Sequence, residues 1–140
     1  MKEFMIYLKQ ALSISKEIGD RKSEGYTLGS IGNIYIYLGQ TEEAIEYYDQ
    51  ALKISKEIGD QEKEGAHLGN LGLGYSDLGQ LKKAIKCYKD GLAISREIGH
   101  QQGEGSHLGN LGNAYYLLGQ LEEAVECYEQ SLAIKQRSWT

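Results

Sequence analysis

Residues 38–60, LGQTEEAIEYYDQALKISKEIGD, decide the fold because the chain repeats them with few changes. They return as LGQLKKAIKCYKDGLAISREIGH at residues 78–100 and as LGQLEEAVECYEQSLAIKQ at residues 118–136. The preceding stretch, EGYTLGSIGNIYIYLG, also returns, as EGAHLGNLGLGYSDLG and EGSHLGNLGNAYYLLG. A period of 40 residues predicts an array of similar units that stack on one another.

The beginning of the chain fits the same period. Residues 1–20 align with the second half of a unit, so the sequence contains half a unit followed by three full units, 21–60, 61–100 and 101–140. We expect them to form one continuous solenoid, because a single unit cannot bury its apolar faces alone.

Apolar side chains recur at helical spacing in both halves of a unit, and neither set alternates as a strand would. The first half carries Leu28, Ile31, Tyr35 and Leu38, and the second half carries Ala44, Ile45, Tyr48, Leu52 and Ile58. The pattern predicts an all-α protein of about seven helices arranged in antiparallel pairs.

Glycines and short polar residues mark the predicted helix ends. Gly39 and Gly59, with their equivalents, stand where a helix is expected to end in a left-handed residue. Asp20 and Asp60 are predicted to cap the first helix of their units, and Thr41 the second helix.

Small residues predict close packing within each helix pair. Gly32 and its equivalents on the first helix, with Ala44 and its equivalents on the second, should leave room for the rings of Tyr35, Tyr75 and Tyr115. The residues around ISKEIGD are expected to lengthen the second helix, with Ile54 and Ile58 as additional core.

Composition excludes several classes of function. The net charge is −5 with both signs interspersed, so no basic surface for nucleic acid is expected. The first ten residues lack the uninterrupted apolar stretch of a signal peptide or a membrane span. Cys87 and Cys127, the only cysteines, have no ligand-spaced partners and are expected to be free thiols of a cytoplasmic protein.

The repeated pattern resembles the tetratricopeptide repeat. One unit matches its signature at Leu71-Gly72, Tyr75, Gly79, Ala84, Tyr88 and Gly91, and another at Ile31-Gly32, Tyr35, Gly39, Ala44, Tyr48 and Ala51. The resemblance covers essentially the whole chain and implies a right-handed α-solenoid. Two departures are the missing proline after the second helix and a unit six residues longer than the usual 34. The longer unit is similar to the Leu-Gly-Asn class of adaptors and to microbial regulatory proteins of the family.

Such solenoids have a concave groove lined by their first helices. Glycine lets a ligand backbone come close, and asparagine both donates to and accepts from peptide groups, so we expect the groove to hold a peptide or a helix. An alternative interpretation is that these glycines only serve helix packing. The residues expected in the groove are Gly29, Asn33, Ile36, Tyr37, Gly69, Asn70, Leu73, Ser76, Asp77, Gly109, Asn110, Asn113, Tyr116 and Leu117.

Other kinds of site are not expected. Chaperone-binding members of the family hold a carboxylate with asparagines and cations, but here Gly29, Ser106 and Asn110 stand at the basic positions. His67 and His107 recur beside the expected groove without converging ligands, so no metal is predicted. No catalytic set and no cofactor motif is present, and the chain is not expected to be an enzyme.

The expected function is therefore noncatalytic binding of a protein or peptide, without nucleic acid or membrane as partner. Two alternatives stay open: a structural or self-assembling scaffold, and a regulatory array from a larger enzyme or signalling protein. Apolar residues at both ends, such as Phe4 and Leu132, suggest that chains could associate end to end as homo-oligomers. Trp139 lies outside the repeat pattern.

Overall fold

The protein is a stack of seven α-helices, with no strand in the part of the chain that the structure describes. The structure is a computed structural model, which describes the backbone of residues 1–139 and the side chains of residues 1–137. The side chain of Trp139 lies outside that range. The helices are α1 (Lys2–Ile18), α2 (Arg21–Tyr37), α3 (Thr41–Ile58), α4 (Gln61–Asp77), α5 (Leu81–Ile98), α6 (Gln101–Leu117) and α7 (Leu121–Trp139).

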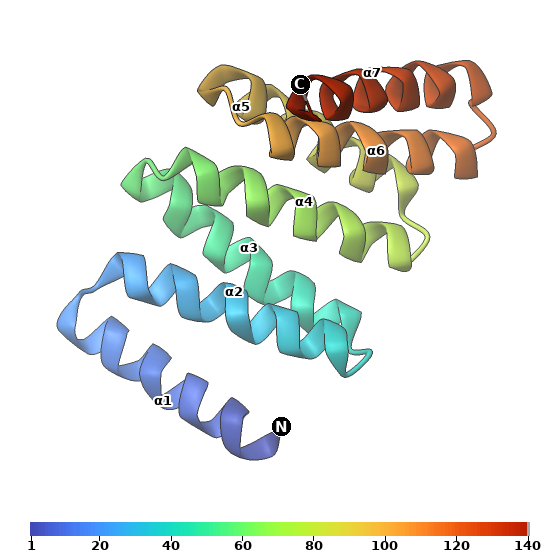
Figure 1. Ribbon diagram of the computed structural model, residues 1–140. Helices are drawn as coiled ribbons and strands as arrows, with labels where there is room; N and C mark the ends of the chain where they lie inside the picture. The colour runs from blue at the N-terminus through green and yellow to red at the C-terminus, as the bar shows by residue number, and fades with distance from the viewer. Residues whose placement is uncertain (140) are drawn as a thin grey trace.

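Each helix packs mainly on the helices before and after it in the sequence. The pairs α2–α3, α4–α5 and α6–α7 have the most extensive contacts, and α4 also contacts α6 across the intervening α5. Figure 1 shows the resulting stack, with α1 at one end and α7 at the other. The prediction of an all-α solenoid of about seven helices is confirmed.

The helix ends follow the sequence signals except at one cap. Gly59 ends α3 in the left-handed conformation, with φ of +71°, and the other glycines at the predicted ends have similar angles. Asp60 accepts a hydrogen bond from the Lys63 backbone N–H at 3.1 Å and so caps α4, as Asp20 caps α2. The predicted Thr41 cap is wrong, because α3 begins at Thr41 and its cap position is Gln40.

The predicted core of the second helices is confirmed in part. Ile54 is 3% exposed and packs with Leu28 and Ala51. Ile58, which was also expected in the core, is 42% exposed, because it lines a surface hollow beside Lys22 and Gly25 of α2.

A tyrosine ring on each second helix lies directly over a glycine on the first helix. A Cβ added to Gly72 would lie 2.4 Å from Cε1 of Tyr88, and Gly32 and Gly112 have the same relation to Tyr48 and Tyr128. The sequence prediction had assigned this space to Tyr35, Tyr75 and Tyr115. These rings are on the same helix as the glycines and point to a different side, and Tyr35 instead stacks on Tyr47.

Histidines fill the space between successive units. A Cβ on Gly29 would lie 3.0 Å from Cε1 of His67, and one on Gly69 would lie 3.1 Å from Cε1 of His107. The two histidines are 7% and 5% exposed, so they are mainly packing residues, and each also lines a surface hollow. The glycines at positions 29 and 69 therefore allow one unit to approach the next.

Burial of these histidines affects their ionisation. It lowers the pKa of both His67 and His107 below the ordinary value of 6.5, because the charged imidazole loses its hydration. Lys63 lowers the pKa of His67 further, while Asp60 partly opposes this. His100 lowers the pKa of His107.

Alanine substitution at two glycines of α4 separates packing from helix propensity. We expect Gly72→Ala to lower the free energy of unfolding by about 1–3 kcal/mol, because the new methyl group overlaps the Tyr88 ring. Gly65→Ala is the matched control: its Cβ would lie 3.7 Å from Ile94 Cγ2, so it should raise stability by up to about 1 kcal/mol. Urea unfolding followed by circular dichroism measures both, and equal effects would contradict the ring-on-glycine contact.

Stability should also depend on pH through the buried histidines. Below about pH 6.5 the unfolded chain binds protons that the folded chain does not, so the free energy of unfolding should fall as pH decreases. The limiting slope is about 1.4 kcal/mol per pH unit for each histidine.

The pH effect is measured by urea unfolding between pH 7.5 and pH 5.5. The double variant His67→Gln/His107→Gln should show a smaller fall in stability than the wild type. Gln10→Ala/Gln50→Ala, at exposed positions on α1 and α3, serves as the control and should keep the wild-type slope. The same slope in the wild type and in the double variant would rule out the buried histidines as its source.

Candidate functional site

The first helices of neighbouring units enclose a hollow of about 530 Å³, here called the α4–α6 hollow. The N-terminal half of α4 forms one wall, the start of α6 forms the other, and the end of α5 lies between them. It is lined by Gln61, Glu62, Lys63, Gly65, Ala66, Gly69, Asn70, Leu73, Ile94, Ser95, Ile98, His100, Gln102, Gly103, Ser106, His107 and Asn110.

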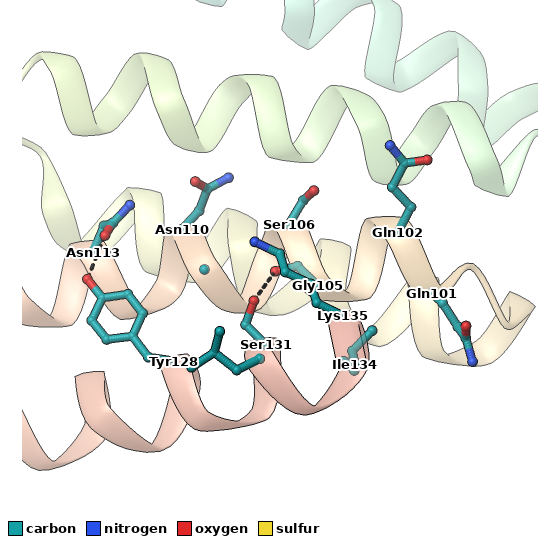
Figure 2. Close-up of a pocket in the computed structure, with 12 residues that line it drawn as sticks. Gln101, Gln102, Gly105, Ser106, Asn110, Asn113, Tyr128, Ser131, Ile134 and Lys135 are labelled. Atoms are coloured by element: carbon teal, nitrogen blue, oxygen red, sulfur yellow. Dashed lines mark hydrogen bonds between the residues drawn. The ribbon is translucent and has the colours of Figure 1, made fainter. Parts of the chain in front are cut away.

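A second hollow of about 990 Å³, the α6–α7 hollow, follows along the stack. In Figure 2, Gln102, Ser106 and Asn110 extend from α6 away from α7, while Tyr128 and Ser131 reach α6 from α7. Its lining consists of Gln101, Gln102, Gly105, Ser106, Gly109, Asn110, Asn113, Tyr128, Ser131, Leu132, Ile134 and Lys135. Gln102, Ser106 and Asn110 line both hollows, so the two are continuous along α6.

Two of the predicted asparagines are oriented by tyrosines. The hydroxyl of Tyr128 donates to Oδ1 of Asn113 at 2.5 Å, as Figure 2 shows, and Tyr48 does the same to Asn33. Because the amide oxygen is engaged, the amide NH₂ is the group left to donate to a ligand. In the middle unit Leu73 replaces the asparagine and cannot accept a bond from Tyr88.

Six of the predicted groove residues lie in the hollows, and the others do not. The six are Gly69, Asn70, Leu73, Gly109, Asn110 and Asn113. The residues placed elsewhere are Gly29, Asn33, Ile36, Tyr37, Ser76, Asp77, Tyr116 and Leu117.

The residues placed elsewhere have two kinds of surroundings. Gly29 is buried against His67, and Ile36 packs on the apolar cluster around Ala44 and Tyr48, so neither offers an open groove surface. Five of the others are exposed: Asn33, Tyr37, Asp77, Tyr116 and Leu117. Ser76 is half-buried. The hollows thus lie nearer to the N-terminal ends of the first helices than the sequence had indicated.

The hollows also contain residues that sequence reasoning missed. Ala66 and Lys63 lie four and seven residues before Asn70, and Ser106 and Gly103 stand in the same relation to Asn110. Helical periodicity, extended backward from the asparagines, would have found them. The ends of the second helices, such as Ile94 and Ile98, were assigned only to the core.

The lining is mainly uncharged and rich in hydrogen-bonding groups. Glu62 and Lys63 bring one charge of each sign to the α4–α6 hollow, and Lys135 is the charged residue of the α6–α7 hollow. The remaining polar groups are mostly amides and hydroxyls. This lining can bind neutral polar groups, such as peptide units, better than it can bind a cluster of like charges.

The thiols and carboxylates of the described residues do not form an obvious reactive set. Burial raises the pKa of the Cys87 thiol to about 11 and also raises the pKa of Cys127, so both are mainly protonated at neutral pH. Among residues 1–137 no three His, Cys, Asp or Glu side chains converge as a metal site would require. The described helices include none with the length and apolar character needed to cross a membrane.

Solved structures with the same fold include two Rap proteins and a signal transduction ATPase. The apo form of RapI is 22% identical and superposes with a TM-score of 0.90 over 96% of this chain. A Rap protein complexed with competence and sporulation factor is 24% identical, with a TM-score of 0.84 over 93% of this chain. A signal transduction ATPase with a tetratricopeptide repeat sensor, from Pyrococcus horikoshii, is 27% identical, with a TM-score of 0.85 over 96% of this chain.

This chain corresponds to only part of those proteins. It spans 49% of the RapI chain, 36% of the Rap chain in the complex and 21% of the ATPase chain. No curated protein matches its sequence. The family pattern described as the tetratricopeptide repeat matches residues 6–57 and 63–137, which is most of the sequence. The chain therefore belongs to the tetratricopeptide repeat family.

Proposed function

We propose that this chain is a noncatalytic protein-binding module that holds a peptide segment or a helix of a partner in the continuous α4–α6 and α6–α7 hollows. The observation that carries the proposal is the lining: two adjoining hollows of about 530 and 990 Å³ combine apolar surface with polar groups that are mostly neutral amides and hydroxyls. Pockets of this size suit several residues of a peptide.

The arrangement of the amides favours an extended peptide over a helix. Asn70, Gln102 and Asn110 line the α4–α6 hollow, where they can donate to and accept from the free backbone groups of an extended segment. A helical ligand satisfies its own backbone and would need apolar anchors. Tyr116 and Leu117 of α6 lie outside both hollows, and the exposed apolar residues within them, Leu73, Ile98 and Leu132, stand on three different helices.

The structural relatives agree with a role in recognition. One Rap protein of this fold is complexed with competence and sporulation factor, and the ATPase from Pyrococcus horikoshii carries its repeats as a sensor. By analogy, this chain would be the recognition part of a regulatory protein.

A second candidate function is self-assembly, because the outer faces of the first and last helices are apolar and open. Phe4 is 54% exposed, whereas Ala44, its equivalent 40 residues later, is 0% exposed. Leu132 is 59% exposed, whereas its equivalent Leu92 is 8% exposed. A second copy of the chain could cover either face.

Selection from a phage-displayed library of random peptides tests the binding function. We expect the wild type to select peptides, and Asn70→Ala/Asn110→Ala to weaken their binding about tenfold or more through the loss of two neutral hydrogen bonds. Gln10→Ala/Gln50→Ala, which removes exposed amides from second helices, is the matched control and should keep full affinity.

The outcome separates the two candidate functions. Peptides that bind the asparagine double variant as tightly as the wild type would contradict binding in the hollows. If no peptide is selected, and sedimentation shows oligomers that grow with protein concentration, self-assembly replaces peptide binding as the function.

A further inference from the structure

A hollow lies at equivalent positions between α2 and α4 and between α4 and α6, but the two hollows differ greatly in volume. The α2–α4 hollow has a volume of about 40 Å³, compared with about 530 Å³ for the α4–α6 hollow. Every residue of the smaller hollow corresponds, after a shift of 40 positions, to a residue of the larger one. The smaller hollow is lined by Lys22, Gly25, Tyr26, Ile54, Ser55, Ile58, Asp60, Lys63 and His67.

Five of the nine residues that line the smaller hollow are identical at the equivalent positions of the larger one. A glycine, two isoleucines, a serine and the buried histidine are retained, as Gly65, Ile94, Ile98, Ser95 and His107 in the larger hollow. The backbone and the apolar walls of the larger hollow are therefore a second copy of the smaller one.

Two residues of the smaller hollow have much smaller equivalents in the larger one, although Lys63 itself also lines the larger hollow. Tyr26 corresponds to Ala66, and Lys63 corresponds to Gly103. Nζ of Lys63 lies 5.4 Å from the centroid of the Tyr26 ring, a cation–π distance, so the two side chains stay together at the mouth. The larger hollow has no ring and no long side chain at these two equivalent positions, so the place that the Tyr26 ring holds, with 67% of its surface exposed, is open there.

We infer that the α4–α6 hollow receives an aromatic side chain of the bound peptide, which takes the place that Tyr26 occupies one unit earlier. The inference rests on the proposed peptide-binding function and adds the class of side chain that is recognised. Ile94 and Ile98 supply apolar contact for the ring, and Gly65 adds no side chain beside it. Ser106 and Asn110 remain available at the same hollow for the polar groups of the peptide.

The chain itself supplies the design of a closed variant. Ala66→Tyr/His100→Asp/Gly103→Lys copies the closing residues of the α2–α4 hollow into the α4–α6 hollow. The change at position 100 is needed because a Cβ on Gly103 would lie 2.5 Å from Nδ1 of His100. In the smaller hollow Asp60 stands there and accepts from the Lys63 backbone N–H.

The reciprocal variant opens the smaller hollow. Tyr26→Ala/Lys63→Gly removes the two closing side chains, which should create a second recess of the same kind. Circular dichroism spectra of both variants check that the helices are kept.

N-acetyl-tyrosinamide is the probe, and N-acetyl-alaninamide is the control ligand. Backbone amide NMR should show saturable shifts at Ala66, Gly103 and His107 with the tyrosine probe only. The closed variant should bind the probe at least tenfold more weakly. The opened variant should show a second set of shifts, at the backbone amides of positions 26 and 67. Equal shifts with the alanine compound, or unchanged binding to the closed variant, would overturn the inference.

Peptides selected by the wild type provide the second readout. They should share an aromatic residue, and the closed variant should bind them at least tenfold more weakly. If the closed variant binds the selected peptides as tightly as the wild type does, the aromatic recess is overturned. The peptide-binding function is then still supported. If the closed variant loses the tyrosine probe, the aromatic recess is supported, even when the library yields no peptide. A library that yields no peptide would overturn only the peptide-binding function.

Discussion

The contact between a tyrosine ring and a helical glycine determines how closely the two helices of each unit approach. Tyr88 lies so close to Gly72 that no Cβ fits between them, and the same pair recurs in the units before and after. A glycine in a helix costs about 1 kcal/mol relative to alanine, so burial of the ring has to offset that cost. Tyr88 is 1% exposed, which indicates that its full apolar area contributes.

Once the helix pair is fixed, the remaining apolar surface can be buried only by the next unit. His107 reaches Gly69 and Gly91 of the preceding pair, and Gly74 of α4 similarly meets Ile45 of α3. Extensive contacts therefore join consecutive helices, with the α4–α6 contact in addition. This neighbour-to-neighbour packing leaves a hollow at the junction of α2 with α4 and at that of α4 with α6, lined by Tyr26 and Ala66 respectively.

The forty-residue period was sufficient to predict the helices, most of their ends and the all-α solenoid, because equivalent residues face equivalent surroundings in a repeat. It could not predict which ring covers Gly32, since Tyr35 and Tyr48 are both compatible with the spacing. It also misplaced Ile58, because periodicity does not show that a hollow opens beside the last turn of α3. For the groove, the asparagines at 70, 110 and 113 were found, but the recess at Ala66 and Gly103 was missed. A recess made by small residues leaves no positive signal in one sequence, and only comparison with Tyr26 and Lys63 in the folded chain reveals it.

Insertion of a second copy of residues 61–100 after His100 tests most directly whether stability comes from stacking between neighbours. Circular dichroism and urea unfolding of the lengthened chain measure its helix content and its unfolding midpoint. Neighbour stacking predicts that the added unit folds as helix and that the midpoint rises, because one more junction is buried. An added unit that stays unfolded, or one that lowers the midpoint by splitting a single closed core, would contradict the account.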